Sequence, residues 1–449
     1  MGPVALCILA LVVVCITHWV SRWRNPRCSG QLPPGSMGLP LVGETIQFFT
    51  PTTSSDIPPF IKNRIDRMFL YNMFETTICY SILRYGPVFR TNLVGQSIII
   101  TTDPEFSYFV FQEEGKLFQS WYPDTFVEIL GKQNMGALHG ILHKCLKNMA
   151  LNLFGPESLK KMLPEVEQAA CRNLKRWSSQ ESVELKEASA TGRKQAVRML
   201  KNQLQGRREK PSQEQRDFFD YVLEELERAD TILTEEIALD LMFGLLFASY
   251  KTTSLAITMA TKFLLENPLA LKELTVEHEE ILRRRENSDS GFTWKEYKSM
   301  KFTFQLINET VRMANIAPGI FRKTVEDVKF QGYTIPAGWF VMVCPPAVHM
   351  NPANYKDPLQ FNPKRWENDN MQGMELTGAS KHFMAFGGGM RFCLGADFAK
   401  VQMAVFLHCL VTKYRWKAIK GGAIVRTPAL TFPNGFHVQF SGKNEFKQD

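Results

Sequence analysis

A single cysteine, Cys393, lies between two glycine-bearing turns in the stretch AFGGGMRFCLGADFAK, residues 385–400. A phosphate-binding loop would end in Gly-Lys followed by Ser or Thr, and that ending is absent. A zinc site would need a second Cys or His a few residues away, and the stretch contains neither. The remaining chemistry is that of a soft anionic ligand at the start of a helix, where the helix amides favour a thiolate over a thiol.

The residues around this cysteine suggest what it binds. Three glycines, Gly387–Gly389, permit positive φ angles and a close approach of the backbone to a flat ligand. Gly395 lets the loop turn into the following helix, and the guanidinium of Arg391 can bind a carboxylate of the same ligand. A cysteine thiolate that can bind iron, next to an arginine that can bind the propionates of haem, is the pattern of a haem site with a cysteine ligand.

The ten residues Phe386–Gly395 match F-x-x-G-x-R-x-C-x-G, the haem-binding signature of the cytochromes P450, and the chain resembles that family over most of residues 32–440. Segments such as YGPVFRTNLVG and HFMAFGGGMRFC resemble plant microsomal P450s that oxidise steroids, triterpenoids and terpenoid hormones. The resemblance implies a mostly α fold with small β-sheets (α+β) and haem b with the Cys393 thiolate as axial iron ligand. It also implies O₂ and NADPH electrons delivered by NADPH–cytochrome P450 reductase. By motif match, the cofactor-binding residues of this loop are Phe386, Gly389, Arg391, Cys393 and Gly395.

Two further motifs occur in the order that the family has. ETVR contains Glu309 and Arg312, and FNPKRW contains Arg365. In the family these three residues form a buried ion network that braces the haem pocket. Glu309 and Arg312 are three residues apart and therefore share a helix face. Such a pair usually lies on the protein surface, but here the resemblance implies a structural lock without a catalytic role.

The resemblance also implies further partners for the haem propionates. His143 and Lys147 occupy the positions of the aromatic residue and the arginine in the family's W-x-x-x-R helix. Arg322 lies where a strand arginine reaches the other propionate. The alternative for each residue is an ordinary solvated side chain.

The stretch LMFGLLFASYKTTSLAITMA, residues 241–260, is apolar all round, and this pattern predicts a long helix, about 235–265, that crosses the core. The family uses a threonine in [AG]-G-x-[DE]-T-T to hydrogen-bond iron-bound dioxygen, and the matching catalytic residues are Thr252 and Thr253. Lys251 replaces the acid that helps relay protons. Because an ammonium relays protons poorly near neutral pH, we expect slow or uncoupled oxygen activation, with peroxide as the by-product.

The N-terminus predicts a membrane anchor. Residues 3–20 form an apolar run long enough to approach the roughly 30 Å of a bilayer core. Arg22, Arg24 and Arg27 follow, so the positive-inside rule places the rest of the chain in the cytosol. A cleaved signal peptide is the alternative, but its charge pattern and cleavage site are missing. We therefore expect a single-pass protein of the endoplasmic reticulum membrane with a cytosolic catalytic domain.

The predicted organisation is an anchor (1–21), a basic and Pro-rich hinge (22–44) and one haem domain (45–449). Short strands are expected in 85–103 and 321–345, helices over most of 105–180, 294–313 and 396–412, and a terminal hairpin. Residues 68–83 read as an insertion, because the family pattern continues from RIDR to RYGPVF. Near 189–193 the sequence passes from one family helix to a later one, so about sixty residues of the distal helices are expected to be missing.

The composition limits the function classes. The net charge of +8 on 449 residues lacks the clustering that nucleic-acid binding requires, and a solvated basic face explains it. Nine scattered cysteines without a C-x-x-C pair indicate a reducing compartment. We expect a monomer that contacts lipid, a hydrophobic small molecule and the reductase.

The sequence therefore predicts a membrane-anchored monooxygenase that oxidises a hydrophobic terpenoid or steroid. By family position, residues 316–320 and 430–435 line the substrate pocket. Lys251 and the distal helices that are expected to be missing favour an alternative, which is a haem-binding but catalytically impaired variant or an incomplete gene model. A haem sensor or carrier without chemistry is the third hypothesis.

Overall fold

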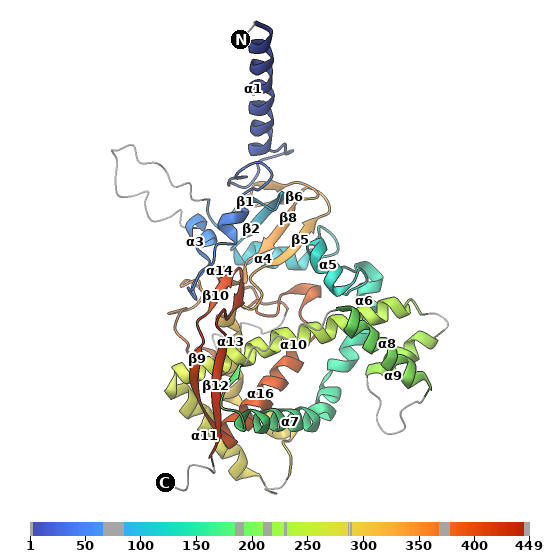
Figure 1. Ribbon diagram of the computed structural model, residues 1–449, viewed down its shortest axis with the longest axis vertical. Coiled ribbons are helices and arrows are strands. Elements are labelled where there is room, and N and C mark those ends of the chain that lie inside the picture. Colours follow the sequence, from blue (N-terminus) through green and yellow to red (C-terminus); the bar gives the residue numbers. More distant parts are fainter. Residues whose placement is uncertain are drawn as a thin grey trace.

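The computed structural model describes residues 3–65, 85–184, 193–209, 218–228, 231–285, 287, 290–367 and 378–443. The expected insertion at 68–83 lies outside these ranges, and so does the expected junction near 189–193 up to residue 192. The described part is rich in helices with small sheets, as the sequence predicted (Figure 1).

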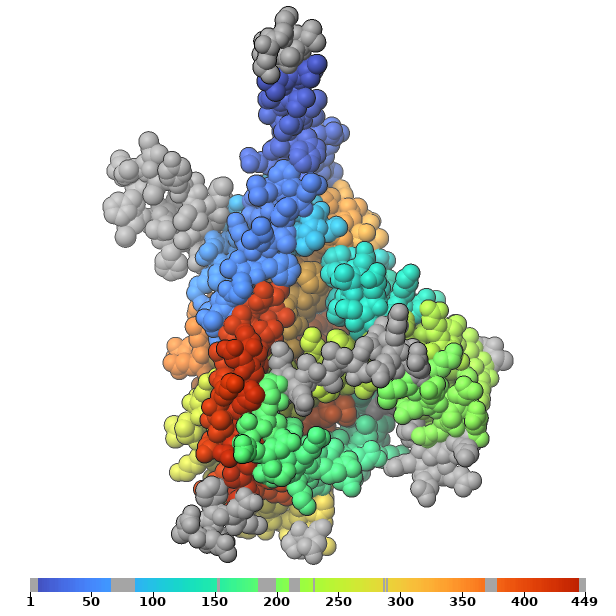
Figure 2. Space-filling view, viewed as in Figure 1, coloured from blue at the N-terminus to red at the C-terminus, as the bar shows by residue number. Residues whose placement is uncertain are grey.

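The N-terminal apolar run forms one helix, α1 (Pro3–Arg24), which projects from the body (Figures 1 and 2). Within it, the window Cys7–Arg24 is apolar and long enough to cross a membrane, and none of it is buried in the protein. The Pro-rich segment that follows lies against the body. The amide of Arg90 donates to Pro34 O (2.8 Å), and the amide of Thr334 donates to Gln31 O (2.7 Å).

The largest sheet lies next to this segment. It has the order β1-β2-β8-β5-β3, in which β2 and β8 are parallel and the other neighbours antiparallel. Its strands are rich in β-branched and aromatic residues, and several are buried on both faces. The bounds are β1 (Val88–Leu93), β2 (Gln96–Thr101), β3 (Phe118–Ser120), β5 (Ile320–Thr324) and β8 (Phe340–Val343).

The C-terminal strands form smaller sheets. The expected terminal hairpin is present as β9 (Tyr414–Gly421) paired with β12 (Phe436–Gly442), and β4 (Val183–Glu184) adds to the same sheet. Two further pairs are β6 (Val328–Phe330) with β7 (Tyr333–Ile335), and β10 (Val425–Thr427) with β11 (Ala429–Thr431).

Helices form the larger part of the body. The bounds are α2 (Thr45–Phe48), α3 (Pro59–Ile65), α4 (Pro104–Gln112), α5 (Asp124–Leu130), α6 (Gly140–Phe154), α7 (Pro156–Ser178), α8 (Arg193–Glu209), α9 (Phe218–Glu227), α10 (Glu235–Glu266), α11 (Pro268–Arg284), α12 (Trp294–Ser299), α13 (Lys301–Ala314), α14 (Pro345–His349) and α16 (Ala396–Lys413). The main hydrophobic core lies where α7, the second half of α10, α11, α13 and α16 pack together.

One buried polar contact joins α11 to α16 in this core. His278 Nδ1 lies 3.0 Å from His408 Nδ1, and both side chains are buried. Burial, and secondarily the repulsion that would arise if both rings were protonated, lowers the pKa of His278 to about 3. Burial also lowers the pKa of His408 to about 4. The folded protein therefore holds both rings neutral.

The structure corrects two sequence predictions about helices. The helix expected over 294–313 is divided at Met300, whose backbone is extended. The second part, α13, can begin there because the Glu277 carboxylate accepts from the amides of Phe302 (2.7 Å) and Thr303 (2.9 Å), which serve as its first donors.

The second difference concerns α10, which was expected to cross the core. Its two ends are buried, but Leu246 is 53% and Tyr250 48% exposed. Lys251 and Thr252 are exposed as well. An apolar sequence alone could not reveal this difference, because the burial of a helix depends on which other groups pack against it.

Candidate functional site

The Cys393 loop is held in shape by its own backbone. The amide of Cys393 donates to Phe386 O (2.9 Å), and the amide of Phe392 donates to Gly389 O (3.1 Å) within a short 3₁₀ turn, η2 (Gly389–Arg391). Helix α16 then starts at Ala396, three residues after the cysteine. The loop thus presents Cys393 immediately before a helix N-terminus, as the sequence predicted.

Two glycines of this loop combine the backbone freedom that was expected with a close contact to α4. Gly389 has φ +59°, and a Cβ there would lie 2.1 Å from the carbonyl oxygen of Phe111. A Cβ at Gly388 would lie 2.4 Å from the Phe111 ring. These two glycines therefore let the loop press against the end of α4. Gly395 has φ −88°, and a Cβ there would meet nothing within 4 Å, so the turn into α16 does not require glycine.

The Cys393 side chain is accessible at the surface of the protein, but other protein atoms surround most of it. Desolvation raises the pKa of its thiol, the Gly395 amide opposes this shift, and Asp397 adds to it. The Gly395 amide at the helix start therefore acts in the predicted direction, toward the thiolate, while burial opposes it. A thiol of this kind loses its proton when it binds a metal ion, because the metal stabilises the sulfur anion.

Two arginines meet at one buried carboxylate close to this loop. Arg391 Nε lies 3.1 Å from Glu114 Oε1, and Arg322 Nε pairs with Glu114 Oε2. Arg391 also donates to the carbonyls of Met135 (2.9 Å) and Leu138 (2.7 Å). Glu114 was not among the predicted site residues, because no neighbouring motif in the sequence marks it.

The other predicted propionate partners come from α6 and join the same cluster. Lys147 Nζ donates to Met390 O (2.5 Å), next to Arg391 in the loop. Burial, together with the charges of Arg391 and Lys147, lowers the pKa of the His143 ring to about 4. Burial and Arg391 also lower the pKa of Lys147. This group carries more positive than negative charge in a poorly solvated place, and a ligand with two carboxylates would balance it.

The predicted oxygen-binding residues lie in the exposed middle of α10. Thr252 Oγ1 donates to Ala248 O one turn earlier (2.7 Å), and α10 continues without a break through this point. Thr253 is buried, and Lys251 Nζ lies 5.8 Å from the centre of the Phe247 ring. Phe386, at the other end of the site loop, is partly buried against the main core.

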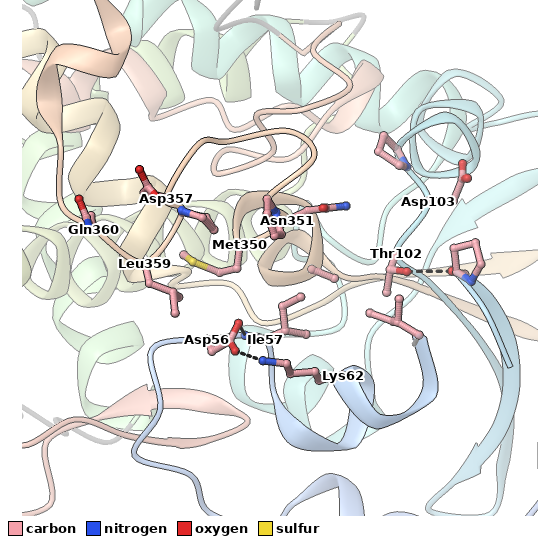
Figure 3. A pocket seen from close by; sticks show the side chains of 16 residues that line it. Asp56, Ile57, Lys62, Thr102, Asp103, Met350, Asn351, Asp357, Leu359 and Gln360 are labelled. Atoms are coloured by element: carbon pink, nitrogen blue, oxygen red, sulfur yellow. Dashed lines mark hydrogen bonds and ion pairs between the residues drawn. The ribbon is translucent and has the colours of Figure 1, made fainter. Parts of the chain in front are cut away.

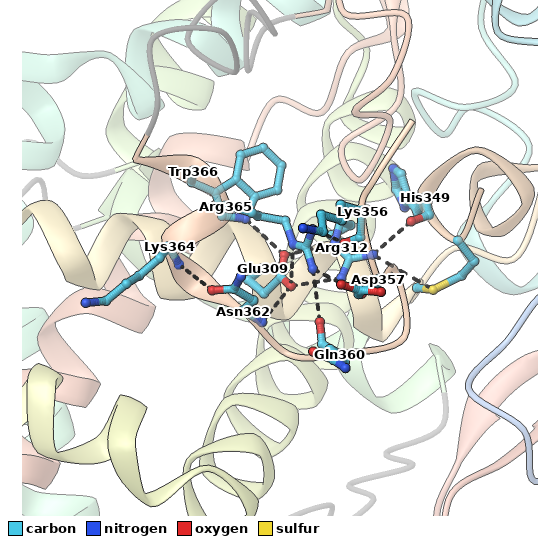
Figure 4. A network of polar contacts seen from close by, with 11 residues as sticks. Glu309, Arg312, His349, Lys356, Asp357, Gln360, Asn362, Lys364, Arg365 and Trp366 are labelled. Atoms are coloured by element: carbon cyan, nitrogen blue, oxygen red, sulfur yellow. Dashed lines mark hydrogen bonds and ion pairs between the residues drawn. The ribbon is translucent and has the colours of Figure 1, made fainter. Parts of the chain in front are cut away.

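The predicted lock residues form a buried network (Figure 4). Glu309 accepts two hydrogen bonds from Arg312, both 2.8 Å, and one from Arg365 Nε (2.9 Å). Its carboxylate also accepts from the Asn362 amide (2.9 Å) and from Trp366 Nε1 (3.0 Å), within and beside the turn η1 (Pro363–Trp366). The network ties α13 to the segment that follows β8 and α14.

The two segments expected to line a substrate pocket are braced together by one residue. Arg426 is buried and donates to the carbonyls of Met313 (3.2 Å), Ala314 (2.8 Å) and Asn315 (3.3 Å) at the end of α13. Burial lowers the pKa of Arg426 to about 10. This contact holds β10 and β11 beside the start of segment 316–320.

A cleft of about 690 Å³ lies elsewhere, between α3, the start of α4 and the region of Met350 and Asn351 (Figure 3). An ion pair between Asp56 and Lys62 borders it. None of the predicted site residues lines this cleft.

Comparisons with known proteins decide the family. The sequence profile of the cytochromes P450 matches residues 184–436. The chain is also 48% identical to cytochrome P450 87A3 of Oryza sativa subsp. japonica over 491 aligned positions, which cover 98% of this chain and 91% of that protein. The chain belongs to the cytochrome P450 family.

Further relatives of this P450 carry names that state a reaction. It is 37% identical to beta-amyrin 16-alpha-hydroxylase of Maesa lanceolata, with 99% of this chain and 100% of that protein covered. It is 35% identical to cucurbitadienol 11-hydroxylase of Siraitia grosvenorii, with 99% and 100% covered. Among solved structures, this chain is similar to retinoic acid bound cyanobacterial CYP120A1, with a TM-score of 0.76 and 21% sequence identity. The match covers 92% of this chain and 100% of that one, so the two proteins share the fold.

Membership in this family implies a haem-thiolate centre, and the residues present fit it. The loop supplies one accessible thiol, and the neighbouring cluster supplies an excess of buried cations for two propionates. In the part of the chain that the structure describes, no group of three or more His, Cys, Asp and Glu side chains could hold a different metal ion.

Proposed function

We propose that this P450 is a membrane-anchored monooxygenase that hydroxylates or otherwise oxidises a hydrophobic terpenoid or steroid. O₂ and electrons from NADPH, delivered by NADPH–cytochrome P450 reductase, would drive the reaction. The observation that carries the proposal is the Cys393 loop placed beside the Arg391, Arg322 and Lys147 cations. The names of the relatives, which act on beta-amyrin, cucurbitadienol and cholesterol, support the substrate class.

In this proposal Cys393 holds the haem iron, and Arg391, Arg322, Lys147 and His143 hold the propionates. When bound, the haem supplies the activation of O₂ that allows one oxygen atom to enter a C–H bond. Gly388 and Gly389 position the loop by their contact with α4. The Glu309 network keeps the neighbouring segments in register and takes no part in the chemistry.

Thr252 is the residue that we assign to proton handling. Its hydroxyl proton is directed to Ala248 O, so the oxygen lone pairs remain available to accept a hydrogen bond from a second donor. Lys251 beside it is a cation that cannot take up a further proton, in contrast to the acid of the family pattern. We infer that this replacement limits the supply of protons to the site.

The membrane assignment rests on α1 and the arginines that end it. Arg22 and Arg24 lie in its last turn, and Arg27 follows. We propose that α1 crosses the membrane of the endoplasmic reticulum once, with the P450 body on the cytosolic side. The net charge of +8 would then assist contact with an acidic reductase surface.

A second candidate, an impaired P450 or an incomplete gene model, is favoured by a specific observation. The alignments with cytochrome P450 87A3 and beta-amyrin 16-alpha-hydroxylase extend over 491 and 498 positions, whereas this chain has 449 residues. This difference supports the absence of a segment that the relatives contain. Such a chain would bind haem but hold its substrate poorly.

Spectroscopy of reconstituted full-length protein tests the haem assignment. We expect the reduced carbon-monoxide complex to show the red-shifted Soret band of thiolate ligation, and Cys393→Ala to lose it. Cys28→Ser is the matched control, because Cys28 is half-buried near the hinge and away from the loop. Protein that stays colourless, or a Cys393→Ala spectrum equal to the native one, would contradict the proposal.

Mass spectrometry of the protein from its natural tissue tests the gene-model alternative. Trypsin would release residues 68–84 as one peptide and residues 187–193 as another. Detection of both peptides would show that the insertion and the junction are translated. Their absence, together with peptides from a longer chain, would assign the unusual segments to the gene model.

A further inference from the structure

Two cysteines that the proposed monooxygenase chemistry does not use lie side by side. Cys171 is on α7 and Cys409 on α16, two helices that pack against each other (Figure 1). Their sulfur atoms are 3.4 Å apart. Lys413, one turn after Cys409, places its Nζ 3.3 Å from Cys171 Sγ. A disulfide bond of about 2.05 Å requires the sulfurs to approach by roughly 1.4 Å, which small side-chain rotations provide.

The two thiols differ in access and in charge. Cys171 is half-buried, whereas Cys409 is fully buried. The hydrogen bond from the Cys409 thiol, with help from Lys413 and against the effect of burial, lowers the pKa of Cys171 to about 6. The same hydrogen bond and burial raise the pKa of Cys409. Cys171 is therefore the thiolate of the pair.

The other ionisable groups near Cys171 do not cancel the effect of the positive charge of Lys413. Glu167, one turn before Cys171, opposes the thiolate, but its carboxylate is occupied by the amide of Phe292 (2.7 Å). Tyr414 follows Lys413 and is neutral at ordinary pH, because burial and the nearby thiolate raise its pKa. The pair thus combines an accessible thiolate, a cation and a second thiol within contact distance.

We propose that Cys171 and Cys409 form a peroxide-sensitive dithiol, in which Cys171 reacts first and Cys409 closes a disulfide between α7 and α16. Hydrogen peroxide, or another hydroperoxide, is the oxidant. The Cys171 sulfur attacks one peroxide oxygen, the O–O bond breaks, and the leaving hydroxide takes a proton from Lys413 or solvent to become water. Cys409 then attacks the Cys171 sulfenic acid and displaces a second water. With hydrogen peroxide, two thiols and one peroxide give one disulfide and two water molecules; with another hydroperoxide, the products are one disulfide, one alcohol and one water molecule.

The disulfide would link α7 to the helix that starts three residues after Cys393. The inference does not depend on monooxygenase activity, because its readout is the oxidation state of two thiols. Failure of the proposed function and failure of this inference can therefore be told apart.

The test uses full-length protein in detergent, treated with increasing hydrogen peroxide at pH 7, blocked with a thiol reagent and digested with trypsin. We expect a linked product of residues 162–172 and 401–413 whose mass is two hydrogen atoms below the sum of the two peptides. Cys171 should be oxidised at roughly tenfold less peroxide than Cys28, which is also half-buried.

Variants separate the roles of the three residues. Cys409→Ser should leave Cys171 as a sulfenic or sulfinic acid without a link between the peptides. Lys413→Met should slow the oxidation of Cys171 several-fold, and Lys413→Arg should restore most of the rate. The inference is wrong if native protein gives no linked peptide, or if Cys171 is no more sensitive than Cys28.

Discussion

Removal of the Glu309 carboxylate should be among the most destabilising changes of charge in this P450. Glu309 is completely buried and accepts five hydrogen bonds, three of them from the guanidinium groups of Arg312 and Arg365. In Glu309→Gln, the side-chain amide offers one acceptor oxygen and turns an NH₂ group toward donors. At least two of the five donors then lose their acceptor, and two buried cations lose their counter-charge.

The size of the effect follows from the loss of one partner of a buried ion pair, which costs about 3–5 kcal/mol. Arg365 keeps the carbonyls of Lys356, Asp357 and Gln360 as acceptors, whereas Arg312 keeps the carbonyl of His349. We therefore expect Glu309→Gln to cost more than the removal of either arginine, because it leaves both of them unpaired.

Urea unfolding of the full-length protein in detergent, followed by tryptophan fluorescence, measures this free energy. Trp366 is a built-in reporter, since its Nε1 donates to Glu309 (3.0 Å). Glu280→Gln is the matched control. Glu280 pairs with Arg284 on the exposed face of α11 at 3.2 Å, and loss of such a pair costs about 0–1 kcal/mol.

A double variant tests the cause as well as the size. In Glu309→Gln combined with Arg312→Met, one stranded cation is removed, so the loss should be smaller than the sum of the two single losses by a few kcal/mol. A Glu309→Gln cost no larger than that of Glu280→Gln, or strict additivity in the double variant, would refute the argument.

Three further predictions concern the loop, the proton relay and acid stability. Gly389→Ala should lower the unfolding midpoint and the haem content, because the backbone there has a positive φ and the new Cβ would collide with the α4 backbone. Gly395→Ala should leave the midpoint unchanged. Equal midpoints for the two variants would contradict this prediction. Lys251→Glu should raise substrate turnover and lower peroxide release per NADPH consumed, and unchanged values of both would reject the proton-relay explanation. Burial holds the pKa values of His278 and His408 near 3 and 4, whereas an unfolded histidine has a pKa of roughly 6.5. As the pH falls from 6.5 toward 4, the unfolded chain therefore binds more protons than the folded protein does. Stability should therefore fall by up to about 1.4 kcal/mol per pH unit for each ring, and a native slope no steeper than that of the His278→Gln/His408→Gln variant would disprove it.

Local patterns were enough to predict much of this P450. The apolar N-terminal run forms a helix, residues 85–103 contain the strands β1 and β2, and the long helix expected over about 235–265 is present as α10. The reason is that these features depend on neighbours in sequence, such as an apolar run without breaks or alternation in a strand.

The sequence was less informative where two distant segments meet. It could not show that α13 starts at Lys301, because the capping carboxylate is Glu277 of another helix. It gave no sign that Gly388 and Gly389 are also required by their close contact with Phe111 of α4. The carboxylate that joins Arg322 and Arg391 went unnoticed, since nothing near Glu114 in the sequence marks its partners.

The amino-acid order alone determined the cysteine loop, the anchor and the lock motifs, because each is a short run of residues whose chemistry is local. The tertiary structure decided the rest: which cations gather beside the loop, how many donors converge on Glu309, and that Cys171 lies against Cys409. These are contacts between residues far apart in the chain, and their energies depend on burial and on distances that only the packed fold sets.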